Sequence, residues 1–157
     1  MAGCSRLVAV TAVLVVGGCG APSFDGMVPA LSQPQTEQDR LPTGEGGASV
    51  EAVDAGSSRY LGGTQVAEYW VGLDGEEICL VQALRGTGTV GSSCADAETF
   101  EQSGVWVSTS SLGVSATGLL VPEGFDLADA PVQEEWVVVS ENLAAPADEG
   151  RPQTSSG

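Results

Sequence analysis

Five short apolar runs, each bounded by turn residues, are the feature that most limits how this chain can fold. They are residues 66–73, 78–84, 105–112, 114–121 and 132–139. The runs are rich in Val, Trp, Tyr and Thr, and Gly follows each of the first four within a few residues, a pattern typical of antiparallel strands. Asp74-Gly75 after the first run predicts a hairpin turn, because Gly tolerates a positive φ and Asp can adopt the left-handed conformation.

One short helix is expected among these strands. Residues 95–102 place Phe100 between the acids Glu98 and Glu101, and they would form one or two turns. We take residues 59–143 as the folded domain, because they hold every Trp and Tyr of the chain. The predicted fold is mainly β, a small antiparallel sandwich or open barrel with one helix.

Three tryptophans fall within the predicted strands or next to them. They are Trp70, Trp106 and Trp136. Strand aromatics usually serve packing, so we expect core or half-buried positions. A sugar-stacking platform is the alternative, and it would require all three on one exposed face.

The flanks of the domain differ from it in composition. Residues 19–58 contain four prolines, several Gly and Gln, and no sustained hydrophobic period, which predicts a disordered tether. A flexible coil of about forty residues would have an average span of roughly 35 Å. Residues 144–157 include Pro146 and Pro152 and end in Thr-Ser-Ser-Gly, so we expect a disordered tail.

The N-terminus carries the pattern of an export signal. Arg6 precedes an apolar run, residues 7–16, and Val16-Gly17-Gly18-Cys19 closes it. The run is too short to span a membrane and ends in small residues, as secretory signal peptides do. The junction resembles the lipobox of bacterial lipoproteins. The resemblance implies removal of residues 1–18 and, on Cys19, a diacylglyceryl thioether and an N-acyl chain such as palmitate.

Such a lipid would anchor the protein to the cell membrane on its extracytoplasmic face. The alternative is an ordinary signal peptide in which Cys19 is incidental.

Two cysteines remain once Cys4 leaves with the signal and Cys19 is acylated. Cys79 and Cys94 can pair in only one way, and an exported chain meets an oxidising compartment. We therefore predict a structural disulfide, which the chain-entropy model values at about 3 kcal/mol.

A redox pair and a zinc site are weaker readings of Cys79 and Cys94. Their spacing is not C-x-x-C, and the chain has no His to complete a zinc shell.

The formal net charge of −16 comes from 21 acids against five Arg. Nucleic acid is excluded as a partner, because phosphate binding needs clustered cations. The same charge repels anionic lipid headgroups, so only a covalent lipid would hold the protein at a membrane.

A glycine motif and two acidic turns are the candidate ligand sites. Gly86-Thr87-Gly88-Thr89-Val90-Gly91 matches G-x-G-x-x-G, but a dinucleotide site needs a βαβ unit, so we predict a hairpin loop and no cofactor. The acids are Asp74, Glu76 and Glu77 in the first turn and Glu123, Asp126 and Asp129 in the second. They could offer oxygen ligands to calcium, yet neither has the EF-hand pattern, so solvated acidic loops are the preferred reading.

Catalysis without His or Lys would depend on two carboxylates, as in glycosidases. The candidates are Glu98, Glu101, Asp126 and Glu134. Serine chemistry lacks its usual base, and no G-x-S-x-G elbow is present. We therefore expect no enzyme activity and assign no catalytic residue.

Short motifs of the central segment carry a second resemblance. They are Cys79-Leu80-Val81, Ser92-Ser93-Cys94-Ala95, Phe100, Gly104 and Leu119-Leu120-Val121-Pro122-Glu123-Gly124. A composition with no Lys, one Asn and one Ile indicates a GC-rich genome. Together they resemble small lipoproteins and membrane-tethered proteins of high-GC Gram-positive bacteria. The resemblance implies a short β domain and a location at the membrane, and it implies no activity.

The expected function is that of a lipid-anchored extracytoplasmic module that binds an envelope protein or a cell-wall polymer. A calcium-binding or small-ligand lipoprotein that serves a transporter or sensor is the second hypothesis. A carboxylate-dependent glycan hydrolase is the third.

Overall fold

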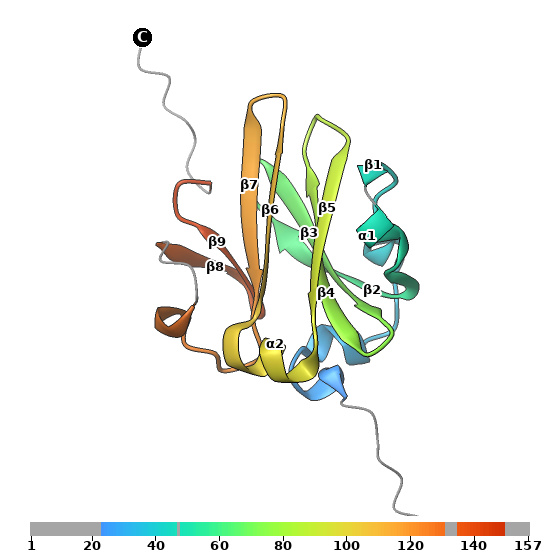
Figure 1. The fold of residues 1–157 in the computed structure, drawn as a ribbon, viewed down its shortest axis with the longest axis vertical. Coiled ribbons are helices and arrows are strands. Elements are labelled where there is room, and N and C mark those ends of the chain that lie inside the picture. The colour runs from blue at the N-terminus through green and yellow to red at the C-terminus, as the bar shows by residue number, and fades with distance from the viewer. Residues whose placement is uncertain (1–22, 47, 131–134, 150–157) are drawn as a thin grey trace, which may run out of the picture.

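Two β-sheets stack face to face in the computed structural model, which describes residues 23–46, 48–130 and 135–149 (Figure 1). The elements, with η for a 3-10 helix, are η1 (Phe24–Gly26), η2 (Pro29–Ser32), η3 (Glu37–Asp39), β1 (Glu45–Gly46), α1 (Ala48–Glu51), β2 (Asp54–Gly63), β3 (Ala67–Asp74), β4 (Glu77–Leu84), β5 (Thr89–Ala95), α2 (Ala97–Ser103), β6 (Val105–Ser111), β7 (Val114–Leu120), η4 (Leu127–Asp129), β8 (Trp136–Ser140) and β9 (Leu143–Pro146).

The strands form a sandwich of unequal sheets. The five-stranded sheet has the order β1-β5-β4-β3-β2, and every pairing in it is antiparallel except that of β1 with β5. The four-stranded sheet has the order β6-β7-β9-β8 and is antiparallel throughout. The sheets do not close on each other, so the mainly β prediction is confirmed in its sandwich form.

The core lies between the sheets because side chains alternate across each strand. Tyr69 and Val71 of β3 and Leu80 of β4 point inward from one sheet, and Val107 and Leu120 point inward from the other. Phe100 of α2 closes one end of this core and packs edge-on against Phe24 of η1, with ring centroids 6.1 Å apart. In Figure 1, η1 and α2 accordingly lie at one end of the sandwich, and the β6–β7 hairpin points away from that end.

The predicted helix is confirmed as α2. Asp96 caps its N-terminus, since the carboxylate accepts a hydrogen bond from the backbone N–H of Thr99 at 2.8 Å. Gly104 ends it with a φ of 67°, a conformation that favours glycine.

The predicted disulfide is also present. Cys79 of β4 and Cys94 of β5 lie directly opposite each other, with Cα atoms 4.0 Å apart. The bridge therefore joins neighbouring strands and lies on the outer face of the five-stranded sheet, beside Val81 and Trp70.

Four strands were not predicted. β1 has only two residues, β2 and β5 are rich in Ser and Gly, and β9 is a short Leu-Ala-Ala-Pro segment, so none has the apolar composition on which the prediction relied. The first hairpin turn is also displaced by one residue. Gly75 and Glu76 form it, with Gly75 at a φ of 58°, while Asp74 pairs with Glu77 in the ladder. Residues 132–134 of the last predicted run lie outside the described residues.

The prediction of a disordered tether is wrong for residues 23–58. Phe24 and Val28 are buried in the main core, while Leu41, Val50 and Val53 cover the outer face of the five-stranded sheet. These side chains are too widely spaced to give a helical or strand period, but they bury apolar surface that would otherwise face water. Residues 19–22 lie outside the described residues.

The domain also extends past residue 143, so the predicted tail begins too early. Ala144 and Ala145 of β9 are buried. Beyond β9, the Glu149 carboxylate accepts a hydrogen bond from the backbone N–H of Thr117 at 2.6 Å. Residues 150–157 lie outside the described residues.

Candidate functional site

A row of side chains crosses the outer face of the four-stranded sheet and is the candidate site. Trp106 lies opposite Leu119, Leu119 opposite Ala144, and Ala144 opposite Val138, so one residue comes from each strand. We call these four residues the outer row. Trp106 is 46% exposed and Val138 is 69% exposed, whereas the two central residues are fully buried.

The middle of the outer row is buried because a connecting segment covers it. Phe125 and Leu127, from the segment between β7 and β8, and Trp136 of β8 pack against Leu119 and Ala144. Asp126 fixes the start of η4 in this segment, since its carboxylate accepts a hydrogen bond from the N–H of Ala128 at 2.9 Å. A hollow of about 90 Å³ lies beside the cover, with Phe125, Leu127 and Val138 in its wall. The two ends of the row remain open.

The row ends at a sheet edge. β8 is the last strand of the four-stranded sheet, and its Val137 is exposed. A cleft of about 390 Å³ separates Val137 and Val139 from Thr64 and Gln65 of the β2–β3 turn. Exposed apolar edge strands are surfaces to which other chains add.

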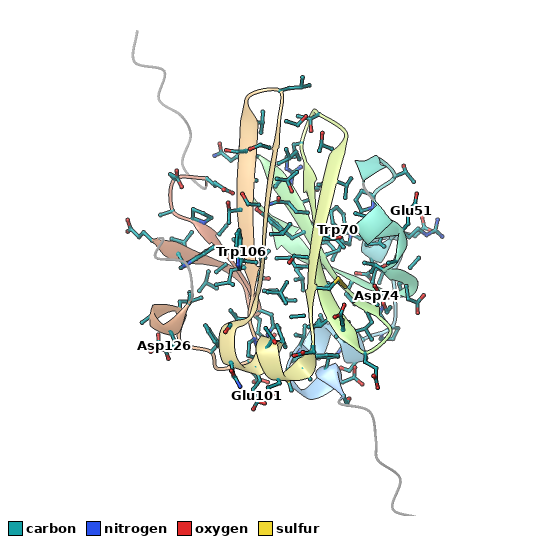
Figure 2. The ribbon with its side chains drawn as sticks, viewed as in Figure 1. Glu51, Trp70, Asp74, Glu101, Trp106 and Asp126 are labelled. Atoms are coloured by element: carbon teal, nitrogen blue, oxygen red, sulfur yellow. A yellow bond between two sulfur atoms is a disulfide. The ribbon has the colours of Figure 1, made fainter. Side chains whose placement is uncertain are left out.

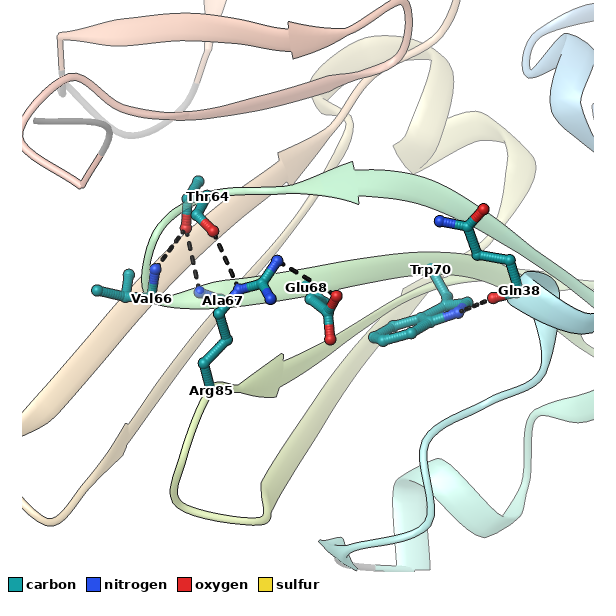
Figure 3. Close-up of polar contacts among 7 residues, drawn as sticks. All are labelled: Gln38, Thr64, Val66, Ala67, Glu68, Trp70 and Arg85. Atoms are coloured by element: carbon teal, nitrogen blue, oxygen red, sulfur yellow. Dashed lines mark hydrogen bonds and ion pairs between the residues drawn. The ribbon is translucent and has the colours of Figure 1, made fainter.

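On the other outer face, the N-terminal segment covers Trp70, and an open hollow of about 420 Å³ remains beside this cover, with Leu41, Val53 and Val90 in its wall. Trp70 is 6% exposed, and its indole N–H donates to the carbonyl oxygen of Gln38 at 3.1 Å (Figure 3). The Trp70 ring also stands edge-on to Tyr60. Nearby, Arg85 pairs with Glu68 at 3.2 Å. The N-terminal segment thus covers Trp70 and leaves Trp106 uncovered on the other sheet.

The three tryptophans therefore do not share one exposed face. Trp70 is buried as expected and Trp136 is half-buried, but Trp106 is exposed. The sequence does carry a signal for this exposure. Trp106 has the same strand parity as Ser108 and Ser110, which face solvent, while Val105 and Val107 point inward.

A polar cluster within the sandwich is the second group of interest. The Tyr69 hydroxyl donates to the carbonyl oxygen of Thr117 at 3.1 Å and accepts from Gln82 Nε2 at 3.1 Å. Burial raises the pKa of Tyr69 to about 12, and the Glu149 carboxylate adds to that effect. The phenol is therefore protonated at neutral pH and cannot act as a base. Its hydrogen bond to Thr117 joins the two sheets, and the one from Gln82 lies within the five-stranded sheet.

The acidic turns do not converge. Asp74 and Asp126 lie on opposite sides of the molecule in Figure 2. Within the described ranges, no three acidic, Cys or His side chains gather to hold a metal ion, so Asp74, Glu76 and Glu77 do not form a ligand set, and neither do Glu123, Asp126 and Asp129.

The other candidate residues are also dispersed. Glu98 and Glu101 are exposed on α2, where Glu98 accepts from Gln102 Nε2 at 3.4 Å, and Glu134 lies outside the described residues. The glycine motif, residues 86–91, forms the turn between β4 and β5 and the start of β5, where a dinucleotide fold would need a helix.

Cys19 and the lipobox lie outside the described residues. In the described part of the chain, no helix combines the length and hydropathy needed to cross a membrane. Comparisons with protein-family models, curated proteins and solved structures found no match to this chain.

Proposed function

We propose that this protein is a lipid-anchored, non-enzymatic module on the extracytoplasmic face of the cell membrane, and that it binds an envelope protein or a cell-wall polymer through the outer row. The observation that carries the proposal is the exposure of Trp106 and Val138 at the two ends of an otherwise buried apolar row. Trp anchors of this kind dominate the binding energy of many interfaces, because they bury a large area at a low entropic cost.

The surroundings of the outer row suit a protein surface more than a small ligand. The hollow beside it, at about 90 Å³, is well below the 300 to 1,000 Å³ of typical ligand pockets, and the cleft of about 390 Å³ at the β8 edge is an open groove between a strand and a turn, not an enclosed pocket. The row is instead a flat strip that ends at the β8 edge, and flat apolar strips with a polar surround are typical of macromolecular interfaces.

The N-terminal segment supports a position close to the membrane. Cys19 precedes Ser23, the first described residue, by four positions, a stretch of at most about 14 Å when fully extended. A lipid on Cys19 would hold the η1 end of the sandwich near the bilayer, rather than at the distance of a forty-residue tether. The outer row runs across the side of such a domain, where a neighbouring envelope component can reach it.

The experiment that tests the proposal is chemical cross-linking in intact cells, followed by mass spectrometry of the tagged full-length protein. Trp106→Ser removes the exposed ring, and Gln102→Ala is the control at an exposed position on α2, away from the four-stranded sheet. We expect a specific cross-linked partner that falls at least tenfold with Trp106→Ser and persists with Gln102→Ala. Cys19→Ala should abolish it by releasing the protein from the membrane.

Two results would contradict the proposal. One is a set of cross-linked partners that does not change in Trp106→Ser, although the variant keeps the melting temperature of the native protein. The other is glycan turnover that a single carboxylate substitution abolishes. The calcium alternative makes a separate prediction, since millimolar calcium would then raise the melting temperature through preferential binding to the folded state.

A further inference from the structure

The turn of the β6–β7 hairpin has an unusual residue at its tip. Ser111 and Val114 pair as the last residues of the strands, so Leu112 and Gly113 form a two-residue turn. Their φ angles are 51° and 79°. A type I′ turn requires positive φ at both positions and favours Asn-Gly, because a leucine side chain is poorly accommodated there.

Leu112 is also exposed to an unusual degree. It is 85% exposed, more than any other exposed large apolar side chain of the described residues. It is the only residue other than glycine with a positive φ in the described part of the chain. Neither the turn geometry nor the core explains a leucine at this position, and strained residues of this kind concentrate at functional sites.

The hairpin that carries Leu112 has no charge. Residues 105–121 contain no acid and no base, in a chain with a net charge of −16. Ser and Thr occupy much of its surface, with Ser108, Ser110 and Ser115 exposed. Interface centres are depleted in charged residues, because a charge that loses its water must be compensated. The hairpin can therefore be enclosed by a partner without that cost.

We propose that the β6–β7 hairpin is a docking arm and that Leu112 is its anchor, which inserts into an uncharged apolar socket of a partner protein. This inference rests on the proposed function, because it assigns a second contact to the same binding module. It adds a contact that the outer row does not include, at the hairpin tip.

A protein socket fits the tip better than a lipid surface does. The hairpin carries no Lys or Arg for phosphate headgroups, and one leucine contributes too few methylenes for stable membrane binding. The hairpin also points away from the η1 end of the sandwich (Figure 1), and η1 is the first described element after Cys19 in the sequence.

Site-specific photocross-linking of the full-length lipidated protein in intact cells tests this inference. A benzophenone amino acid replaces Ser110, which lies two residues before the tip, and irradiation is compared for the native chain, Leu112→Asn and Leu112→Met. We expect one discrete, protease-digestible adduct that falls about tenfold or more with Leu112→Asn and persists with Leu112→Met. Leu112→Asn should at the same time raise the melting temperature by about 2–4 °C, because it suits the turn.

An adduct that Leu112→Asn leaves unchanged would overturn the inference. So would an adduct that is extracted with lipid, or one with twice the mass of this chain, since these indicate a membrane or a second copy. Absence of an adduct at Ser110, with the Trp106-dependent cross-link retained, would overturn the tip contact alone. Absence of both would overturn the proposed function as well.

Discussion

The two outer faces of the sandwich differ in how they are covered. On the five-stranded sheet, Leu41, Val50 and Val53 of the N-terminal segment lie over Trp70 and Val81, and both are buried. On the four-stranded sheet, the β7–β8 connection covers only the middle of the outer row and leaves Trp106 and Val138 exposed. Covering a face buries apolar side chains, whereas an open face can contact a partner, which is why the proposed binding surface lies on the four-stranded sheet.

The largest expected difference in stability is between substitution of Trp70 and substitution of Trp106. Trp70→Ala removes a buried ring and its hydrogen bond to Gln38, so we expect the free energy of unfolding to fall by about 3–5 kcal/mol. Trp106→Ala, the matched substitution on the open face, should lower it by about 1–2 kcal/mol, because the ring is 46% exposed and buries only part of its surface. Urea unfolding measures both. Equal losses would mean that the two faces do not differ.

The next largest loss of stability should come from removal of the disulfide, which lies beneath the N-terminal cover. Replacing Cys79 and Cys94 together by Ala opens a loop of 15 residues, so the free energy of unfolding should fall by about 3 kcal/mol. The same double variant should leave partner binding unchanged, because the bridge and the outer row lie on different sheets. Loss of binding in a folded double variant would connect the covered face to the site.

Asp39 should make the covered face sensitive to acid. Burial alone would raise the pKa of Asp39, but hydrogen bonds from the N–H of Tyr60 and from Thr36 outweigh it and hold the pKa below its usual value. Since the folded-state pKa is lowered, the stability is present above about pH 4 and is lost as the pH falls through the folded-state pKa. Asp39→Asn should therefore cost about 1–2 kcal/mol at pH 7.

Below pH 4, the free energy of unfolding of Asp39→Asn should decrease less steeply with falling pH than that of the native protein, as followed by circular dichroism. Thr36→Val removes one of the hydrogen bonds to Asp39. It should change the stability at pH 7 and the decrease below pH 4 in the same directions, by smaller amounts. If Asp39→Asn and the native protein lose stability identically at acidic pH, the Asp39 carboxylate does not hold the N-terminal cover in place.

The smallest stability effect should come from Val138→Thr, which keeps the shape of an exposed side chain and replaces one methyl group with a hydroxyl. We expect a change within about 0.5 kcal/mol, with weaker cross-linking to the partner. Val81→Thr is its control on the covered face, where burial of the hydroxyl should cost about 1–3 kcal/mol. Unchanged cross-linking by Val138→Thr would remove Val138 from the binding surface.

Local patterns in the sequence were sufficient for much of the fold. Apolar runs with turn residues predicted β3, β4, β6 and β7, and Phe100 between Glu98 and Glu101 predicted α2. The pairing of Cys79 with Cys94 followed from their number. β2 and β5 were missed because Ser and Gly dominate them, and their pairing to stronger strands holds them in the sheet.

The difference between the faces is harder to predict, because it depends on contacts between distant parts of the chain. Leu41 and Val53 look like isolated apolar residues in a polar segment, and nothing local shows that they lie over Trp70. Trp106 is different, since its alternation with Val105 and Val107 does indicate the outer face. Whether another segment covers that face could be seen only in the folded arrangement.

Hydroxyl-radical footprinting with mass spectrometry tests the central claim most directly, because one experiment reads both tryptophans in the native protein. In the purified full-length protein we expect Trp106 to be oxidised several times faster than Trp70. In intact cells Trp106 should become protected, while Trp70 stays protected in both settings. Rapid oxidation of Trp70, or the same oxidation of Trp106 in cells and in purified protein, would contradict the account of a covered face and a binding face.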